Sequence, residues 1–251
     1  MRILGYWRLE NGGREQLLSV RMRLLKEMKE GAYRYAERLP RENVLAERLR
    51  ISRTQLRDSL AQLEREGFIT RRHGVGTVIN RHVLDIRVRM DMEIEFTEMI
   101  LQSGFVPETA FVKWETRPAD STVAARLNLT EGTEVLCVSR LMKASGKPAI
   151  YCEDFVSMSL VKDDAFTKAD FNEPIFTFLK TFCKIEPYMD ITEIHPICAD
   201  RKLASLFQVE EGTALLYMDE LNYDIEGVPV LYSPQHYIGG VVLHTLMRKK
   251  F

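Results

Sequence analysis

The sequence predicts an α+β protein of two domains, a small helical domain that ends in a β-hairpin and a larger domain built on an antiparallel sheet. Its 251 residues exceed one small domain and suit two ordinary ones. Residues 1–90 hold 20 Lys and Arg against 11 Asp and Glu, whereas residues 91–251 hold 15 against 25. A basic first domain fits a nucleic-acid partner, which would repel the acidic second domain. The alternative is that the positive charge is only solvated surface.

Composition excludes several classes of protein. Hydrophobic residues make up 45% and charged residues 28% of the chain, which is typical of a folded globular protein. No stretch approaches the ~18 apolar residues of a membrane helix, and the N-terminus lacks the apolar core of a signal peptide. We therefore expect a cytoplasmic protein without a membrane partner. The cysteines lie far apart and indicate buried thiols in a reducing compartment; they are Cys137, Cys152, Cys183 and Cys198.

Three helices are predicted in the basic part. Residues 16–30 have apolar side chains at helical spacing, and Gly31 ends the run. Residues 42–49 form a short second helix. A third helix starts after Ser52, which with Gln55 has the spacing of a capping box, and stops at Gly67. The second and third helices, joined by residues 50–51, predict a helix-turn-helix whose third helix enters the DNA major groove by its N-terminal end.

The side chains at the start of the third helix are suited to DNA. An arginine donates two hydrogen bonds to guanine, and a hydroxyl bonds a phosphate or a base edge. The candidates in this turn are Ser52, Arg53, Thr54, Gln55 and Arg57. The alternative is that Arg53 and Arg57 pair with Asp58 or Glu64 on a solvated surface.

A β-hairpin follows in residues 68–80. Gly74 and Gly76 mark its turn, and Arg71, Arg72 and His73 lie near the tip. The hairpin would form the wing of a winged helix-turn-helix. His73 has no second metal ligand at usable spacing, so we interpret it as a DNA or solvent group.

Residues 31–79 resemble the GntR family of bacterial transcription regulators. The matching motifs are Gly31-x-Tyr33, Leu39-Pro40-x-Glu42, Leu45-Ala46, Ile51-Ser52-Arg53, Leu56-Arg57, Glu66-Gly67 and Arg71-Arg72-x-Gly74-x-Gly76-Thr77. The resemblance implies that Arg53, Thr54 and Arg57 read DNA from the helix, and His73 and Gly74 from the wing. Arg41, Ser52, Gln55, Arg72 and Thr77 complete the candidate DNA-binding set.

Two positions depart from the family pattern. Asn43 and Val75 stand where the family usually has basic residues, which removes two expected DNA contacts. Arg41 replaces a common Ser and returns part of the lost charge. We therefore expect an operator that differs in detail from the commoner sites of the family.

The acidic part contains an internal repeat. Residues 124–155 and 203–237 each have the pattern of a short helix, a turn, a long strand, a turn with Gly and a second strand. Gly132-Thr133 matches Gly212-Thr213, and Tyr151 matches Tyr232. Two such hairpins can share one antiparallel sheet with helices on one side. The copies differ where Ser139-Arg140 faces Asp219-Glu220 in the alignment, which suggests a site between them.

Residues 95–250 resemble the UTRA ligand-binding domain of the HutC branch of the GntR family. The motifs are Phe96-Thr97-Glu98-Met99, Gly104-Phe105-x-Pro107, the two hairpins and Arg248. The resemblance implies a fold similar to chorismate lyase and a pocket for a small polar metabolite. The candidate effector residues are Thr97, Arg140, Tyr151, Glu153, Glu220, Tyr232 and Tyr237. Thr97 would start a helix that favours an anion, and Arg140 would supply a fixed positive charge.

These residues also have purely structural interpretations. Arg140 could pair with Glu220 across the sheet, Tyr151 or Tyr232 could serve packing alone, and Thr97 could be an ordinary N-cap. His195, His236 and His244 show no metal spacing. We expect an extended linker between the domains, which divides the chain into an extension at 1–14, a winged helix-turn-helix at 15–80, the linker at 81–92 and the effector domain at 93–251.

The sequence thus predicts a transcription regulator, and a repressor is the expected kind. It would bind a palindromic operator as a homodimer, because one short helix reads only a few base pairs. Its effector would be a sugar phosphate, an organic acid or an amino-acid catabolite. The runner-up is a DNA-binding regulator with a vestigial pocket that protein partners control. The chain offers no nucleophile with a base, no metal set and no catalytic motif, so neither an enzyme nor a cofactor is expected.

Overall fold

The computed structural model describes residues 12–92 and 94–249. They divide into two compact units, one running up to Arg87 and including the residues from Met247 onward, the other spanning Val88–Leu246. Of the predicted extension 1–14, residues 1–11 lie outside the described residues. Residues 12–14 belong to the first helix. Within the described part of the chain, no helix is both long enough and apolar enough to span a bilayer.

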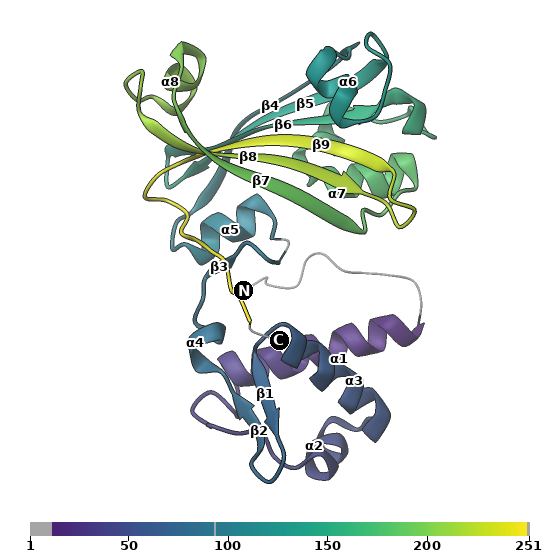
Figure 1. Cartoon of the computed structure of the whole chain (residues 1–251), viewed down its shortest axis with the longest axis vertical. Coiled ribbons are helices and arrows are strands. Elements are labelled where there is room, and N and C mark those ends of the chain that lie inside the picture. The colour runs from purple at the N-terminus through teal and green to yellow at the C-terminus, as the bar shows by residue number, and fades with distance from the viewer. Residues whose placement is uncertain (1–11, 93, 250–251) are drawn as a thin grey trace. The chain divides into compact units, whose positions relative to one another are not determined.

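The N-terminal unit has the predicted helices and hairpin (Figure 1). Its elements are α1 (Gly12–Lys29), α2 (Glu42–Leu49), α3 (Arg53–Arg65), β1 (Ile69–Arg72), β2 (Gly76–Ile79) and α4 (Arg81–Leu84). One stripe on each helix packs into a common core, in which Leu24, Leu45, Leu56 and Leu63 are almost fully buried.

The turn between α2 and α3 is fixed by local chemistry. Arg50 adopts a left-handed conformation with φ 56°, and its N–H donates to carbonyls in the last turn of α2. Ser52 then caps α3, since its Oγ accepts from the Gln55 N–H at 3.2 Å while the Gln55 side chain accepts from the Ser52 N–H at 3.1 Å. The predicted capping box is confirmed, and it sets where the exposed first turn of α3 begins.

The segment after the hairpin corrects one expectation. We expected residues 80–92 to be extended, but Arg81–Leu84 form α4 and Val88–Arg89 form β3. The Arg81 guanidinium donates to the carbonyls of Met28, Tyr33 and Ala36, which ties α4 to the end of α1. This long-range tie cannot be read from local alternation of charge, so the sequence pattern was misleading here.

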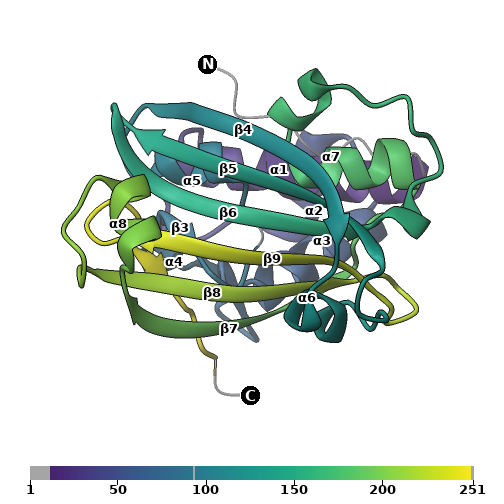
Figure 2. The ribbon, with the colours of Figure 1, turned by 90° about the horizontal axis from the view of Figure 1, so that it is seen from above.

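The C-terminal unit is built on one six-stranded antiparallel sheet with the order β4-β5-β6-β9-β8-β7 (Figure 2). The predicted repeat is confirmed and extends further, because each copy also begins with a strand. The first copy is β4 (Pro107–Pro118), α6 (Ser121–Arg126), β5 (Glu134–Ala144) and β6 (Lys147–Ser157); the second is β7 (Met189–Cys198), α8 (Arg201–Phe207), β8 (Ala214–Tyr223) and β9 (Pro229–Ile238). The two copies meet where β6 pairs with β9.

Helices cover both faces of this sheet (Figure 1). α6 and α8 lie on one face, here called the α6/α8 face, and pack at its two ends. The opposite face, here called the α5/α7 face, carries α5 (Phe96–Gln102), η2 (Lys168–Asn172), α7 (Ile175–Phe178) and η3 (Leu179–Cys183). The remaining elements are η1 (Met158–Leu160) and β10 (His244–Thr245), which pairs in parallel with β3.

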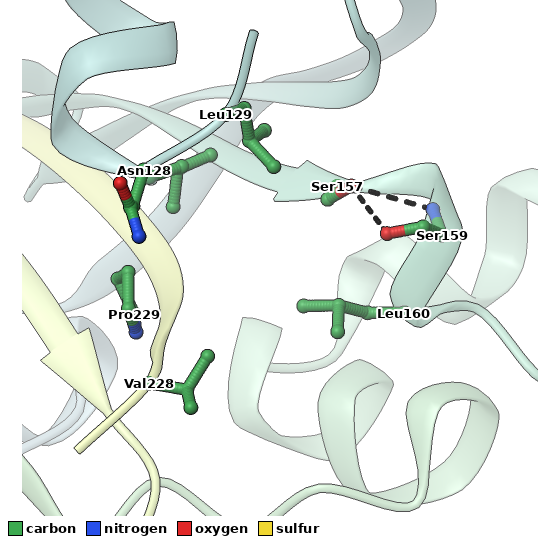
Figure 3. Close-up of a pocket in the computed structure, with 8 residues that line it drawn as sticks. Asn128, Leu129, Ser157, Ser159, Leu160, Val228 and Pro229 are labelled. Carbon is green, nitrogen blue, oxygen red and sulfur yellow. Dashed lines mark hydrogen bonds between the residues drawn. The ribbon is translucent and has the colours of Figure 1, made fainter.

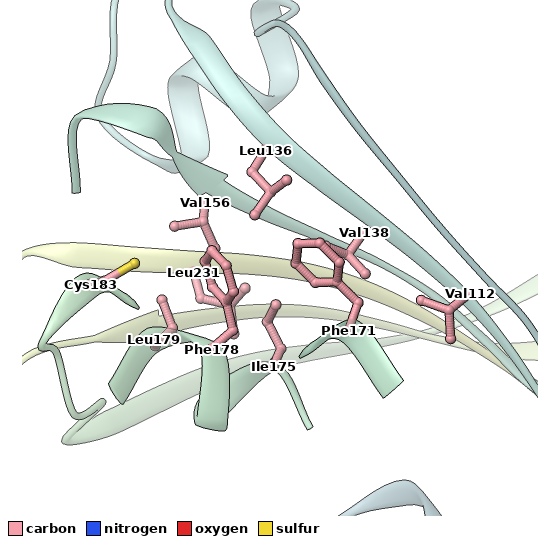
Figure 4. Packing of buried hydrophobic residues seen from close by; sticks show 10 residues of the cluster. All are labelled: Val112, Leu136, Val138, Val156, Phe171, Ile175, Phe178, Leu179, Cys183 and Leu231. Atoms are coloured by element: carbon pink, nitrogen blue, oxygen red, sulfur yellow. The ribbon is translucent and has the colours of Figure 1, made fainter. Parts of the chain in front are cut away.

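An aromatic cluster forms the core of the α5/α7 face (Figure 4). Phe171 of η2 and Phe178 of α7 stack with ring centroids 5.3 Å apart and are at most 1% exposed. They pack against the aliphatic side chains of Leu136, Val138 and Val156 on β5 and β6. The cluster holds the helical segment 168–183 on the sheet.

Truncating this cluster should destabilise the C-terminal unit. We expect Phe178→Ala to lower the free energy of unfolding by about 3–5 kcal/mol, because it leaves a cavity that the sheet cannot fill. Urea denaturation followed by circular dichroism measures the change. Tyr188→Ala is the matched control, since this side chain is 67% exposed and its loss should cost no more than about 0.5 kcal/mol. Equal effects of the two changes would contradict the packing described.

Candidate functional site

The first turn of α3 presents polar side chains to solvent. Ser52, Arg53 and Thr54 are exposed, and Gln55 is half-buried because its side chain completes the cap. The predicted side chains therefore gather at the N-terminal end of the helix, where the backbone N–H groups favour an anion.

Arg57 follows one turn later and has a partner that the sequence did not indicate. Its Nε lies 2.8 Å from Glu42 Oε2 of α2, and this pair raises the pKa of Arg57. The alternative pairing with Asp58 or Glu64 is wrong for Arg57, and Glu64 instead binds Arg71 at 2.7 Å. The side chain of Arg57 is 60% exposed. An exposed pair of this kind is weak, so a phosphate can replace Glu42.

The wing presents a second group of exposed residues. Arg72, His73 and Gly74 are exposed at or beside the tip, where Gly74 adopts φ 74° and Gly76 φ 97°, while Thr77 is half-buried. Arg41 is exposed at the N-terminus of α2 and makes no side-chain cap there.

Arg38 was missed by sequence reasoning. Its backbone bridges to Val78 beside β2, and its Nη1 donates to the Val75 carbonyl at 3.1 Å. No local pattern marks this isolated bridge, although the excess of arginine gave a general signal. The N-terminal unit thus carries exposed arginines on three elements around α3, which suits a phosphate backbone.

The sheet separates the predicted effector residues into two groups. Strand register puts Arg140, Glu220 and Tyr237 on the α5/α7 face, and Tyr151, Glu153 and Tyr232 on the α6/α8 face. Because side chains alternate between the faces of a strand, the two groups cannot line one pocket.

On the α5/α7 face, Arg140 is the centre of a buried polar network. Its Nη1 lies 2.8 Å from Asp154 Oδ2, and its other nitrogens donate to the carbonyls of Phe171 and Glu173 at 3.3 and 3.2 Å. The alternative pairing with Glu220 is wrong: Asp154 lies on β6, which pairs with β5, whereas Glu220 lies on β8, which does not. Arg140 is only 6% and Asp154 1% exposed, so neither charge could remain there without the other.

The network continues along β9. Ser233 Oγ donates to Asp154 Oδ1 at 2.7 Å, Gln235 donates to Ser233 at 3.3 Å, and the Tyr237 hydroxyl donates to Gln235 Oε1. Sequence reasoning missed Asp154, Ser233 and Gln235. Alternation within β9 places them on the face of Tyr237, but their link to Arg140 depends on the register between β6 and β9.

Glu220 lies on β8 on the same face, between β9 and β7. Its Oε1 accepts from Asn222 Nδ2 at 3.0 Å, and burial raises the pKa of Glu220 to about 7. The negative charges of Asp190 and Asp154 act in the same direction. Glu220 therefore changes charge close to neutral pH.

Thr97 is placed less favourably than predicted. It is the second residue of α5 and is exposed, and Glu95 occupies the N-cap position. The alternative interpretation as an N-cap is therefore also wrong. The motif located the start of the helix to within two residues, and an error of this size is common for helix boundaries.

On the α6/α8 face, two of the three predicted residues line a hollow. Glu153 and Tyr232 contribute to a cavity of about 420 Å³, together with Arg117, Tyr217 and His236, which sequence reasoning missed. Tyr151 lies at the other end under α8, where Lys202 Nζ sits 5.5 Å from its ring centre. A packing role therefore fits Tyr151 better than Tyr232.

A second hollow of about 200 Å³ lies near the C-terminal end of β6 (Figure 3). It is lined mainly by Leu127, Leu129, Leu160 and Val228, and the hydroxyls of its two serines, Ser157 and Ser159, bond each other at 2.8 Å. It contains none of the predicted residues. Among the described residues no cluster of His, Cys, Asp and Glu could hold a metal ion.

Comparison with known proteins agrees with this architecture. Residues 17–79 match the family described as bacterial regulatory proteins of the gntR family, and residues 102–240 match the UTRA domain. Relatives in Escherichia coli include the probable transcriptional regulator PhnF, 28% identical over 80% of this chain and 82% of that protein, and the probable fructoselysine utilization operon transcriptional repressor, 22% identical over 86% and 87%. The crystal structure of possible transcriptional regulator YydK from Bacillus subtilis shares the fold, with a TM-score of 0.77 at 16% identity over 93% of this chain and 99% of that one.

The fold and the exposed basic helix define a DNA-binding transcription regulator. The chain belongs to the UTRA-domain regulators of the bacterial GntR family, with a winged helix-turn-helix that binds DNA and a UTRA domain that binds an effector. The resemblance drawn from the sequence is thereby confirmed.

Removing the Arg53 side chain should lower both the affinity and the base specificity of operator binding. We expect Arg53→Ala to cost about 1–3 kcal/mol of binding free energy and to relax base preference at one position of each half-site, because a base-reading guanidinium is lost. Gel-shift titration at fixed salt measures both effects. Arg65→Ala, at the opposite end of α3, is the control that should leave base preference intact. Unchanged operator affinity of the Arg53 variant would refute the proposed docking of α3.

Glu220 should make stability depend on pH. Its folded-state pKa of about 7 lies above the ordinary value of 4.5. Its contribution is therefore fully present below pH 4.5 and is lost as pH rises through 7. We expect Glu220→Gln to remove up to about 3 kcal/mol of the stability difference between pH 5 and pH 8. Urea denaturation at the two pH values measures it, with Glu211→Gln as an exposed control; identical pH dependence in all three proteins would contradict the raised pKa.

Proposed function

We propose that this protein is a repressor that releases its operator when a small polar or anionic metabolite binds the UTRA domain. The observation that carries the proposal is the union, in one chain, of an exposed arginine-bearing helix with a domain whose sheet holds a buried guanidinium. The name of the E. coli relative, probable fructoselysine utilization operon transcriptional repressor, supports the repressor role.

Recognition by α3 supports a homodimer on a palindromic operator. The helix has 13 residues, and one such helix covers only a few base pairs. Two copies related by a two-fold axis would read two half-sites one helical turn apart, or a multiple of it. We place this activity in the bacterial cytoplasm, with residues 15–80 reading DNA, residues 81–92 connecting the units and residues 93–251 sensing the effector.

The proposed effector is an anion that competes with Asp154 for Arg140. A phosphate or carboxylate can replace Asp154 as acceptor of the hydrogen bond from Arg140, which fits sugar phosphates, organic acids and amino-acid catabolites. Glu220 and Tyr237 lie on the same face and would bond hydroxyl or amino groups, and Thr97 would lie at the start of α5.

Arg140 also connects the effector to the surrounding chain. Because it bonds the carbonyls of Phe171 and Glu173, an anion at this point would change how residues 168–183 are held. Thermodynamic linkage then requires that operator binding weakens effector binding by the same factor by which the effector weakens operator binding.

Loss of the central charge pair should abolish effector response and spare DNA binding. Arg140→Ala alone would leave Asp154 unpaired and buried, so the test uses the double variant Arg140→Gln with Asp154→Asn, which removes both charges. Wild-type protein is screened by thermal shift against glucose 6-phosphate, citrate and urocanate and related phosphates and acids. A bound ligand at 100 times its Kd adds about 2.7 kcal/mol and raises the melting temperature by several degrees.

We expect a hit for the wild type, no shift for the double variant and equal operator affinity for both proteins without ligand. A shift that survives in the double variant would contradict the role of Arg140. The absence of any hit across phosphates and acids would contradict an anionic effector and favour control by a protein partner.

A further inference from the structure

The α6/α8 face carries a cavity that the proposed effector site does not use. It measures about 420 Å³ and lies on the opposite side of the sheet from Arg140. α6 contributes Thr122 and Val123 to one wall, and the sheet contributes the floor from β6, β8 and β9. The volume falls within the range of small-ligand sites.

The floor of this cavity consists of aromatic rings. Phe155 and Tyr232 stack with centroids 5.9 Å apart, and Tyr217 and His236 lie 5.0 Å apart. The Tyr217 and Tyr232 hydroxyls are 3.5 Å from each other. Phe155 and Tyr232 are only 3% and 4% exposed, whereas Tyr217 and His236 are half-buried. The accessible ring surface therefore comes from Tyr217 and His236, and it suits a ring whose faces carry C–H groups.

The internal repeat places the cavity across the junction of its two copies. Repeat alignment pairs Arg117 with Ile197 and Phe155 with His236, and all four residues line the cavity. Equivalent positions of the two repeat copies thus line the same cavity, but in each pair one side chain is apolar and the other is polar. Duplication for stability alone does not explain why these equivalent positions differ in polarity.

Two groups of opposite charge border the floor. The Arg117 guanidinium lies over the Phe155 ring at 5.2 Å, and the Glu153 carboxylate lies 3.5 Å from Lys202 Nζ. The side chains of Arg117 and Glu153 remain 40% and 23% exposed, so both can bond a ligand. Asp120 also lines the cavity, but one of its carboxylate oxygens caps α6 by accepting from the Val123 N–H at 2.9 Å.

Charges of both signs border the cavity, since Arg117 is basic and Glu153 and Asp120 are acidic. Burial lowers the pKa of His236 and raises those of Tyr217 and Tyr232, so these side chains are neutral at pH 7. A neutral ring that carries hydroxyl groups fits this border, because hydroxyls donate to a carboxylate and accept from a guanidinium.

We propose that the cavity bordered by Arg117, Glu153 and Tyr217 is a second ligand site that binds a neutral monosaccharide or cyclic polyol. It is independent of the proposed anion site around Arg140, which lies on the other face of the sheet. The protein would then respond to two chemically different small molecules through one domain.

The test is saturation-transfer NMR on the full-length protein with methyl β-glucopyranoside, galactose, ribose and myo-inositol as probes. Glucosamine and gluconate serve as cationic and anionic counterparts of the same size. We expect saturation transfer to one or more neutral probes and weaker transfer to both charged ones. No transfer to any neutral probe, or stronger transfer to a charged one, would overturn the proposal.

Variants locate the binding. We expect Glu153→Gln and Tyr217→Ala to weaken the best neutral probe by about tenfold or more, since each removes a partner of the ligand. Glu134→Gln and Tyr188→Ala are matched controls on exposed positions of the same unit and should leave affinity unchanged. Circular dichroism verifies that all variants are folded, and Arg117→Gln replaces any that is not. Unchanged affinity in the cavity variants would overturn the proposal.

The double variant of Arg140 and Asp154 separates this site from the effector site. It should retain neutral-probe binding even though it loses the response to phosphates and acids. Loss of neutral-probe binding in that variant would contradict a second site and place both ligands around Arg140.

Discussion

The ion pair between Arg140 and Asp154 is the interaction on which the effector domain depends. It lies in the middle of the sheet, where neither charge could stay buried alone. The same guanidinium bonds two carbonyls of the segment that carries Phe171, so one side chain joins β5, β6 and η2. The hydrophobic cluster of Phe171 and Phe178 packs this segment against the sheet, whereas the polar network fixes the position of the segment on the sheet. A ligand that takes one hydrogen bond from this network therefore acts on the packing of a whole layer.

The sequence allowed α1 to α3, the wing hairpin and the two repeated helix-and-hairpin units to be predicted, because their signals are local. It did not predict α4, β4, β7 or the helical segment 168–183. A capping box at Ser52 and Gln55, glycines at the turns and a repeated hairpin each leave a mark within a few residues. Partners of charged side chains were not predictable in this way. Glu42 reaches Arg57 across the helix-turn-helix, and Asp154 reaches Arg140 through the pairing of two strands. Both depend on tertiary placement, which one sequence without register information does not contain.

The candidate effector residues illustrate the same limit on a single sheet. Alternation within a strand indicates that Tyr151 and Glu153 share one face, but it does not say which face of the neighbouring strand joins them. The register between β6 and β9 assigns Tyr232 to their side and Tyr237 to the other. A set of residues that looked like one pocket therefore belongs to two surfaces.

The three hydrogen bonds that Arg81 donates connect the two ends of the DNA-binding unit. Met28 stands near the end of α1 and Arg81 at the start of α4, so a single guanidinium closes a loop of more than fifty residues. The carbonyls that it satisfies include one at the C-terminal end of a helix, where backbone acceptors lack partners of their own. Fraying of α4 would expose these acceptors and loosen α1 in the same event. The first and last helices of the unit are thus tied together through one side chain.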